Sequence, residues 1–177
     1  MYIGGMTVTY LILSDSHGRP DRITEAIARV KPDGILFCGD GLQDLTCVDI
    51  PCPLWAVRGN CDWVSSPLIL GNAPLTPDTD AFLSPEGNSI LLTHGHLRGV
   101  KNDLSSLVYY AAEKNLRAVI FGHTHKPLEL HLSPDADSNL PISSPLTLFN
   151  PGSLGDGGSF GTLTVRGGAL LFGHGVL

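Results

Sequence analysis

The sequence has 177 residues and a mass of 18.8 kDa, with 42% hydrophobic and 16% charged residues. Such a composition excludes an intrinsically disordered chain, and at roughly 100–200 residues per domain we expect one domain over residues 1–177. A net charge of -6 without a basic stripe argues against general nucleic-acid binding. No apolar run approaches the about 20 residues that a membrane-spanning helix needs, so we expect no membrane segment.

The five predicted strands of the first two-thirds of the chain are short apolar runs bounded by Gly, Asn or Asp. They cover residues 8–13, 35–38, 54–57, 90–93 and 118–121. Between them lie two apolar patterns with helical spacing. The first predicts a helix from about Asp21 to just before Pro32, and the second a helix around Leu104–Ala111 with Asn102 or Asp103 as its N-cap.

The last third of the chain has a different pattern. Strict alternation predicts a half-exposed strand at 128–132, and a polar, proline-rich loop follows at 133–145. Runs at 146–149, 161–165 and 169–172 indicate antiparallel strands, with Gly167-Gly168 as a hairpin turn. We therefore expect α/β units followed by a meander, in a two-sheet sandwich flanked by helices. The apolar C-terminal strands suit either a core or an interface, so a homo-oligomer remains possible.

Polar residues of one chemical kind follow all five of the first strands. Because sites in α/β sheets form beyond the carboxyl ends of strands, we expect these side chains to meet. Carboxylate and imidazole groups bind divalent metals, and seven such ligands suit two ions about 3.5–4 Å apart. Each motif alone has a simpler interpretation as a helix cap, a turn or a surface histidine. The seven candidate ligands are Asp15, His17, Asp40, Asn60, His94, His123 and His125.

The same residues form motifs that resemble the calcineurin-like metallophosphoesterase superfamily, in its small bacterial and archaeal phosphodiesterase branch. The motifs, in order, are Asp15-x-His17, Gly39-Asp40, Gly59-Asn60-Cys61-Asp62, His94-Gly95-His96, Gly122-His123-Thr124-His125 and Asn150-Pro151-Gly152-Ser153. The resemblance implies an α/β fold: a four-layer α-β-β-α sandwich of two mostly mixed β-sheets flanked by helices.

The resemblance also implies a dinuclear metal centre and its ligands. One ion would be held by Asp15, His17 and His125, the other by Asn60, His94 and His123, and Asp40 would bridge them. The expected cofactors are two divalent ions, with Mn²⁺ favoured and Fe, Zn, Ni or Mg left open. The expected reaction is hydrolysis of a small phosphate ester, most simply a diester, by a metal-bridging hydroxide.

The candidate catalytic residues are Asp40, Asn60 and His96. Larger relatives have Asn-His where this chain has Asn60-Cys61, and a thiol with a pKa near 8.5 is a poor general acid. His96 or a water molecule would have to replace that histidine. Asp62 and Asp44 would orient ligands or cap turns.

Two alternatives stay open at this stage: a catalytically weak protein-interaction scaffold of the same fold, and a phosphomonoesterase. The four cysteines, Cys38, Cys47, Cys52 and Cys61, form no C-x-x-C pair in a mid-sized chain. They indicate reduced thiols and hence a cytoplasmic protein.

Overall fold

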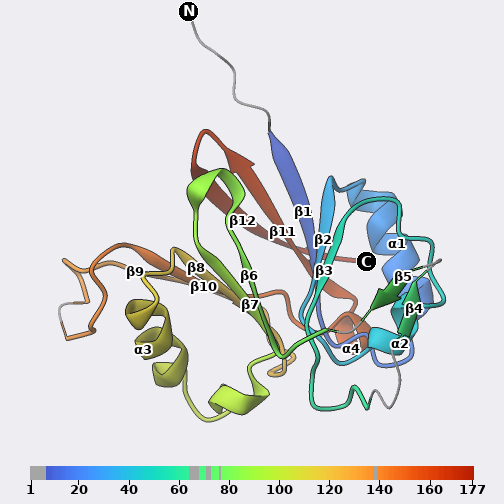
Figure 1. Ribbon diagram of the computed structural model, residues 1–177, viewed down its shortest axis with the longest axis horizontal. Coiled ribbons are helices and arrows are strands. Elements are labelled where there is room, and N and C mark those ends of the chain that lie inside the picture. Colours follow the sequence, from blue (N-terminus) through green and yellow to red (C-terminus); the bar gives the residue numbers. More distant parts are fainter. Residues whose placement is uncertain (1–6, 64–67, 71–72, 76, 138) are drawn as a thin grey trace, which may run out of the picture.

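Two five-stranded sheets face each other, and helices cover their outer faces (Figure 1). The computed structural model describes residues 7–63, 68–70, 73–75, 77–137 and 139–177. This arrangement confirms the predicted α-β-β-α sandwich. The strands are β1 (Val8–Leu13), β2 (Gly34–Phe37), β3 (Leu54–Ala56), β4 (Leu68–Leu70), β5 (Ala73–Leu75), β6 (Asp80–Leu83), β7 (Ile90–Thr93), β8 (Ala118–Phe121), β9 (Leu128–Leu132), β10 (Leu146–Asn150), β11 (Ser159–Arg166) and β12 (Ala169–Val176). The helices are α1 (Pro20–Val30), α2 (Leu42–Leu45), α3 (Ser105–Glu113) and α4 (Leu154–Gly157), with short 3₁₀ turns η1 (Pro85–Gly87) and η2 (His96–Arg98).

Both large sheets mix parallel and antiparallel pairs. The first has the order β12-β11-β1-β2-β3, with β1, β2 and β3 parallel and β11 antiparallel to β1. The second has the order β6-β7-β8-β10-β9, with β7, β8 and β10 parallel. The strands β4 and β5 form a small separate ribbon. The parallel strands of both sheets end on the lower side of Figure 1, which brings their following loops together.

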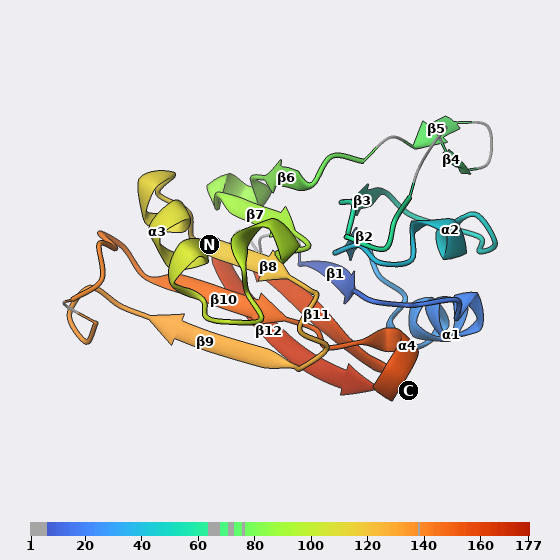
Figure 2. The ribbon, with the colours of Figure 1, turned by 90° about the horizontal axis from the view of Figure 1, so that it is seen from below.

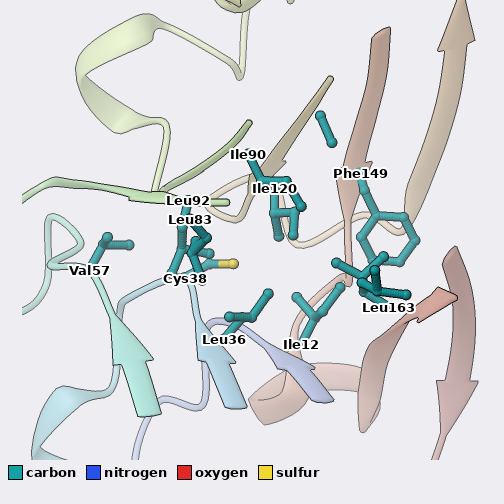
Figure 3. Packing of buried hydrophobic residues seen from close by; sticks show 12 residues of the cluster. Ile12, Leu36, Cys38, Val57, Leu83, Ile90, Leu92, Ile120, Phe149 and Leu163 are labelled. Atoms are coloured by element: carbon teal, nitrogen blue, oxygen red, sulfur yellow. The ribbon is translucent and has the colours of Figure 1, made fainter. Parts of the chain in front are cut away.

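The central strands are buried on both faces because each one contributes to two cores. In β1, Ile12 points into the core between the sheets, whereas Leu11 and Leu13 face the helices α1 and α2. In β8, Ile120 faces the other sheet and Phe121 faces α3. Figure 3 shows the core between the sheets, where residues of the first sheet meet those of the second. This two-sided burial explains why the strands are nearly continuous apolar runs.

The helices complete the outer layers. The helix α1 has Pro20 in its first turn and ends at Lys31, which adopts the left-handed conformation. The helix α3 begins one to two residues later than expected, with Leu104 rather than Asn102 or Asp103 at the N-cap position. The Asp103 carboxylate nevertheless accepts a hydrogen bond from the Ser105 N–H, at 2.7 Å. None of the described helices is both long and apolar enough to cross a membrane.

The expected C-terminal meander is wrong in its pairing. The strands do form where the pattern predicts them, and Gly167 and Gly168 both have positive φ in the β11–β12 hairpin turn. However, β9 and β10 belong to the second sheet, where β10 is parallel to β8, whereas β11 and β12 extend the first sheet. Local alternation defines a strand but not its partner, and β11 pairs with β1 across most of the chain.

Candidate metal centre

Six of the seven predicted ligands lie in two compact groups at the carboxyl ends of the parallel strands. One group consists of Asp15, His17 and His125, and the other of Asp40, His94 and His123. Within each group, one potential ligand atom per residue lies within 4.8 Å of the others. Strand pairing of β1 with β2 and of β7 with β8 brings these loops together, as the sequence predicted.

The first group surrounds a buried carboxylate oxygen. Oδ1 of Asp15 lies 3.1 Å from Nε2 of His125 and 3.7 Å from Nε2 of His17. Among the described residues this oxygen has no hydrogen-bond partner, although Asp15 is completely buried. The other oxygen, Oδ2, accepts hydrogen bonds from the Ser14 hydroxyl and the His123 N–H. Burial raises the pKa of Asp15, against the opposing effects of these bonds and of His94 and His125. An unpartnered buried oxygen beside two imidazole nitrogens fits a bound cation.

The second group is centred on Nε2 of His94. This atom lies 3.2 Å from Asp40 Oδ2, from Asn60 Oδ1 and from His123 Nδ1. Asn60 thus joins the group, as expected. Nδ1 of His94 lies 2.7 Å from the Cys38 carbonyl oxygen, which can only accept a hydrogen bond. The neutral ring therefore carries its proton on Nδ1 and presents the lone pair of Nε2 to its neighbours, which is the tautomer that a metal requires.

The charges of the second group are consistent with cation binding. Burial acts to raise the pKa of Asp40, but the neighbouring His94 ring and the hydrogen bond from the Cys61 N–H outweigh it, so its pKa lies well below the usual range. Burial acts to lower the pKa of His94, but Asp40 and Asp15 raise it overall. Burial and then the charge of His94 lower the pKa of His123 to about 4. The His123 ring is therefore neutral near pH 7, the form in which it could bind a metal.

The two groups adjoin each other. The His123 N–H donates to Asp15 Oδ2 at 3.1 Å and so ties the second group to the first. Asp40 belongs to the second group, because one of its carboxylate oxygens lies within 4.8 Å of ligand atoms of His94 and His123. Its other oxygen, Oδ1, accepts a hydrogen bond from the Cys61 N–H at 2.7 Å.

Five of the seven predicted ligands have a left-handed backbone. They are Asp15, His17, Asp40, His123 and His125, with φ between 43° and 67°. Residues other than glycine rarely adopt this conformation, and backbone strain of this kind gathers at functional sites. The turns after β1, β2 and β8 are therefore made by the candidate ligands themselves.

Glycine is required beside these residues because neighbouring segments of the backbone approach them closely. A Cβ atom on Gly59 would lie 2.1 Å from Oδ1 of Asp40, and one on Gly122 would lie 1.9 Å from the Ser14 hydroxyl. Neither of these two glycines needs a positive φ. Their role is to leave room for the carboxylates of the site.

Asp62 and Asp44 hold the loops that carry the ligands. The Asp62 carboxylate accepts four backbone hydrogen bonds of 2.7–2.9 Å, from the N–H groups of Asp40, Gly41, Leu42 and Gly59. Asp44 accepts from the Ser16 hydroxyl at 2.6 Å and from the Gly18 N–H at 2.9 Å. Both aspartates therefore orient the loops around Asp40 and His17.

Sequence reasoning missed Asp156, which lies in α4. Its Oδ2 is 2.6 Å from Nδ1 of His125, an arrangement that fixes the ring and leaves Nε2 facing Asp15. The carboxylate of Asp156 has a lowered pKa, chiefly because His125 bonds to it. The only available signal was its position three residues after Ser153, whose hydroxyl accepts the Asp156 N–H as a helix cap.

The Asn150-Pro151-Gly152-Ser153 motif connects α4 to the ligand loops. Asn150 donates to the Gly122 carbonyl at 2.8 Å, and the Ser153 hydroxyl donates to the Asp15 carbonyl at 3.0 Å. Arg22 of α1 donates to the carbonyls of Leu154 and Gly155, which places α4 beside α1 (Figure 2). The motif is thus a structural support for the site.

His96 lies at the edge of the second group. Its ring centroid is 5.3 Å from that of His94 and 6.2 Å from that of His123. Burial and the charge of His94 lower its pKa, and within the described chain its buried Nδ1 has no hydrogen-bond partner. Cys61 is exposed, and its sulfur accepts a hydrogen bond from the Asn60 amide at 3.2 Å. Burial, followed by Asp40, raises the pKa of this thiol.

Comparisons with known proteins agree with this geometry. The family model of the calcineurin-like phosphoesterase superfamily domain matches residues 8–168. The probable metallophosphoesterase YsnB of Bacillus subtilis is 31% identical over 117 residues, which cover 65% of this chain and 63% of the relative. The match thus spans less than two thirds of that protein's length.

Two solved structures share the fold. A novel archaeal phosphodiesterase superimposes with a TM-score of 0.70 at 19% identity and covers 96% of this chain and 99% of its own. Vacuolar protein sorting 29 from Cryptosporidium parvum gives a TM-score of 0.68 at 15% identity, with coverages of 96% and 97%. The predicted superfamily is confirmed, and the proteins that resemble this chain include small bacterial and archaeal members. The chain belongs to the calcineurin-like phosphoesterase superfamily.

Proposed function

We propose that this protein is a metal-dependent phosphodiesterase that hydrolyses a small phosphate ester at a dinuclear centre. The observation that carries the proposal is the pair of adjoining ligand groups around Asp15 and His94. The buried, unpartnered oxygen of Asp15 supports a cation in the first group. The convergence of Asp40, Asn60 and His123 on Nε2 of His94 supports one in the second.

The proposed ligands follow the two groups. Asp15, His17 and His125 would hold one ion, and Asn60, His94 and His123 the other, with Asp40 shared between them. Mixed carboxylate, amide and imidazole ligands suit Mn²⁺, which we propose as the working metal, with Fe, Zn, Ni and Mg as competitors. Bound divalent cations would acidify water to give the nucleophile and neutralise phosphate oxygens.

The chain's own residues hold this centre in one arrangement. The Cys38 carbonyl fixes the ring of His94, and the Asp156 carboxylate fixes the ring of His125. Preformed ligands of this kind lose little conformational freedom when a cation or a phosphate binds. Asp40, held by the Cys61 N–H, keeps its negative charge near pH 7 and so remains a strong ligand.

We assign proton transfer to His96 and substrate contact to Asn60. The leaving group must gain a proton. Larger relatives have a histidine at the position of Cys61, and the Cys61 thiol is a poor proton donor because its pKa is raised. His96 is the imidazole beside the second group that is not a proposed ligand, and since its pKa is lowered it would pass a proton from water to the leaving group rather than hold one near pH 7. The exposed amide of Asn60 lies next to His94, where it could also contact a phosphate oxygen.

Replacing Asp40 tests the proposal. Asp40→Asn removes the shared negative charge and should abolish hydrolysis of bis(p-nitrophenyl) phosphate while lowering metal content measured by elemental analysis. The exposed Asp49 is the matched control, and Asp49→Asn should change neither quantity. Unchanged turnover in Asp40→Asn would refute the role of this carboxylate. Dialysis against EDTA and addition of single metals then ranks Mn²⁺ against its competitors.

Two other functions are separated by the same assay. A protein-interaction scaffold is favoured by the shared fold with vacuolar protein sorting 29, and it predicts bound metal without turnover. A phosphomonoesterase predicts faster hydrolysis of p-nitrophenyl phosphate than of the diester. We favour an enzyme over the scaffold because both ligand groups contain their full predicted complement of side chains.

We also propose a cytoplasmic location and one domain over residues 1–177. The four cysteines are unpaired, which suits a reducing compartment. A homo-oligomer through the edge strand β12, where Leu171 and Val176 are exposed, is part of the proposal. Light scattering at several protein concentrations tests it, and a constant monomer mass would exclude it.

A further inference from the structure

An open cleft of about 610 Å³ lies next to the loop that carries the candidate ligands His123 and His125. Its two walls are the segment that leads into α3 and the segment that follows β8. Thr124, which lies between the ligands His123 and His125, is part of the second wall. The cleft falls within the range of about 300–1,000 Å³ that is typical of small-molecule sites.

The floor of the cleft is apolar. Val100 and Phe121 are buried there, and Leu104 and Leu128 pack against the same core between the second sheet and α3. Phe121 and Leu128 belong to β8 and β9, whereas Val100 and Leu104 lie in the segment before α3. An apolar surface beside a phosphate-binding centre suits the organic part of an ester rather than its phosphate.

The rim of the cleft carries two lysines, Lys101 and Lys126, on opposite walls. Both are exposed, and neither forms an ion pair with any described residue. Asp103 also lines the cleft, but its Oδ1 accepts the Ser105 N–H at the start of α3. Lys101 directly follows Val100, whose side chain would lie 3.0 Å from a Cβ atom on Gly95, the residue after the candidate ligand His94. The two lysines outnumber Asp103, so the rim carries a net positive charge in a chain whose net charge is -6.

We propose that this cleft binds an organic group of the phosphodiester and that Lys101 and Lys126 recognise an additional anionic substituent on that group. The inference rests on the proposed function and specifies its substrate class: an ester with an apolar moiety that carries a second negative charge. The phosphate would occupy the metal centre, the apolar moiety would cover Val100 and Leu104, and the second charge would lie between the two lysines.

The first test compares two esters. One is bis(p-nitrophenyl) phosphate, and the other is the analogue that carries a carboxylate on each ring, so that either ring can enter the cleft. Lys101→Ala and Lys126→Ala should each lower kcat/KM for the carboxylated ester by about three- to fivefold, the upper part of the range for exposed ion pairs, and change the parent ester less than twofold. The matched control is Lys114→Ala, which removes a lysine that pairs with Glu113 at 3.1 Å. It should change neither rate.

The second test does not depend on turnover. Calorimetry of the EDTA-treated protein with the carboxylated nitrophenol, the product of the second ester, measures binding to the cleft alone. We expect the same three- to fivefold weakening in each lysine variant and none in Lys114→Ala. If wild-type protein hydrolyses neither ester with any metal, the proposed function fails while this measurement still reports on the cleft. Equal effects of all three variants, or none, in both tests would overturn the proposal.

Discussion

The Asp62 carboxylate offers the sharpest test of how the fold holds the candidate centre. It accepts two backbone N–H groups on each oxygen: Gly41 and Leu42 on Oδ1, and Asp40 and Gly59 on Oδ2. Asp62→Asn keeps the shape but turns one oxygen into an NH₂ group. Two N–H donors then face another donor, so two of the four hydrogen bonds are lost.

The magnitude follows from those two bonds. Hydrogen bonds to a charged group are worth about 1.5–3 kcal/mol each, which gives about 3–6 kcal/mol for the pair. Asp62 is half-buried, so water can reach part of the loop, and we expect the lower end, about 3 kcal/mol. Since the Asp40 N–H is one of the groups held, the variant should also bind Mn²⁺ more weakly than the wild type.

Urea unfolding in the presence of EDTA, followed by circular dichroism, measures the stability change without any contribution from metal. The control Asp49→Asn removes the same charge from an exposed side chain and should leave the free energy of unfolding unchanged. Titration calorimetry of both variants with Mn²⁺ then measures affinity. A stability loss in Asp62→Asn that is indistinguishable from that of the control would refute the inferred role of these four hydrogen bonds.

Three further outcomes are expected. Gly122→Ala should destabilise the protein by about 1–3 kcal/mol in thermal unfolding, because the new methyl group meets the Ser14 hydroxyl, whereas Gly157→Ala, which points into open space, should not. Asp156→Asn should weaken metal binding about 10–100-fold in calorimetry, because His125 loses its charged partner, and unchanged affinity would argue against that role. Mn²⁺ at 100 times its dissociation constant should stabilise the wild type by about 2.7 kcal/mol, and an unchanged melting temperature would contradict metal binding.

The sequence predicted the strands well where burial alone decides the pattern. The strands 8–13, 90–93 and 118–121 begin and end where expected because each apolar run is buried at its end and stops shortly before a polar candidate ligand. It did not predict β6, which starts with Asp80 and carries the exposed Phe82, so its pattern is too weak for a short edge strand. It also did not predict that β11 returns to β1, since such pairing depends on packing between distant segments.

The candidate site was predictable for the residues whose chemistry is conspicuous. Aspartate and histidine directly after buried strands indicate metal ligands, and the structure brings them together. Asp156 was not predictable, because an aspartate in the segment Gly-Ser-Leu-Gly-Asp equally suits a turn or the first turn of a helix. Its role depends on α4 lying against the loop of Asp15, through hydrogen bonds that join positions more than 130 residues apart.

The candidate ligands combine a strained, left-handed backbone conformation with a role in the proposed function. Each such residue costs on the order of 1–3 kcal/mol, and five of them are proposed ligands. The hydrogen bonds to Asp62 and from Ser153 hold two of these loops without any contribution from metal, so the strain is offset by the fold itself. We therefore expect a crystal structure of the EDTA-treated protein to keep positive φ at Asp15, Asp40 and His123. Relaxation of these residues to negative φ would mean that the cation, rather than the surrounding chain, organises the site.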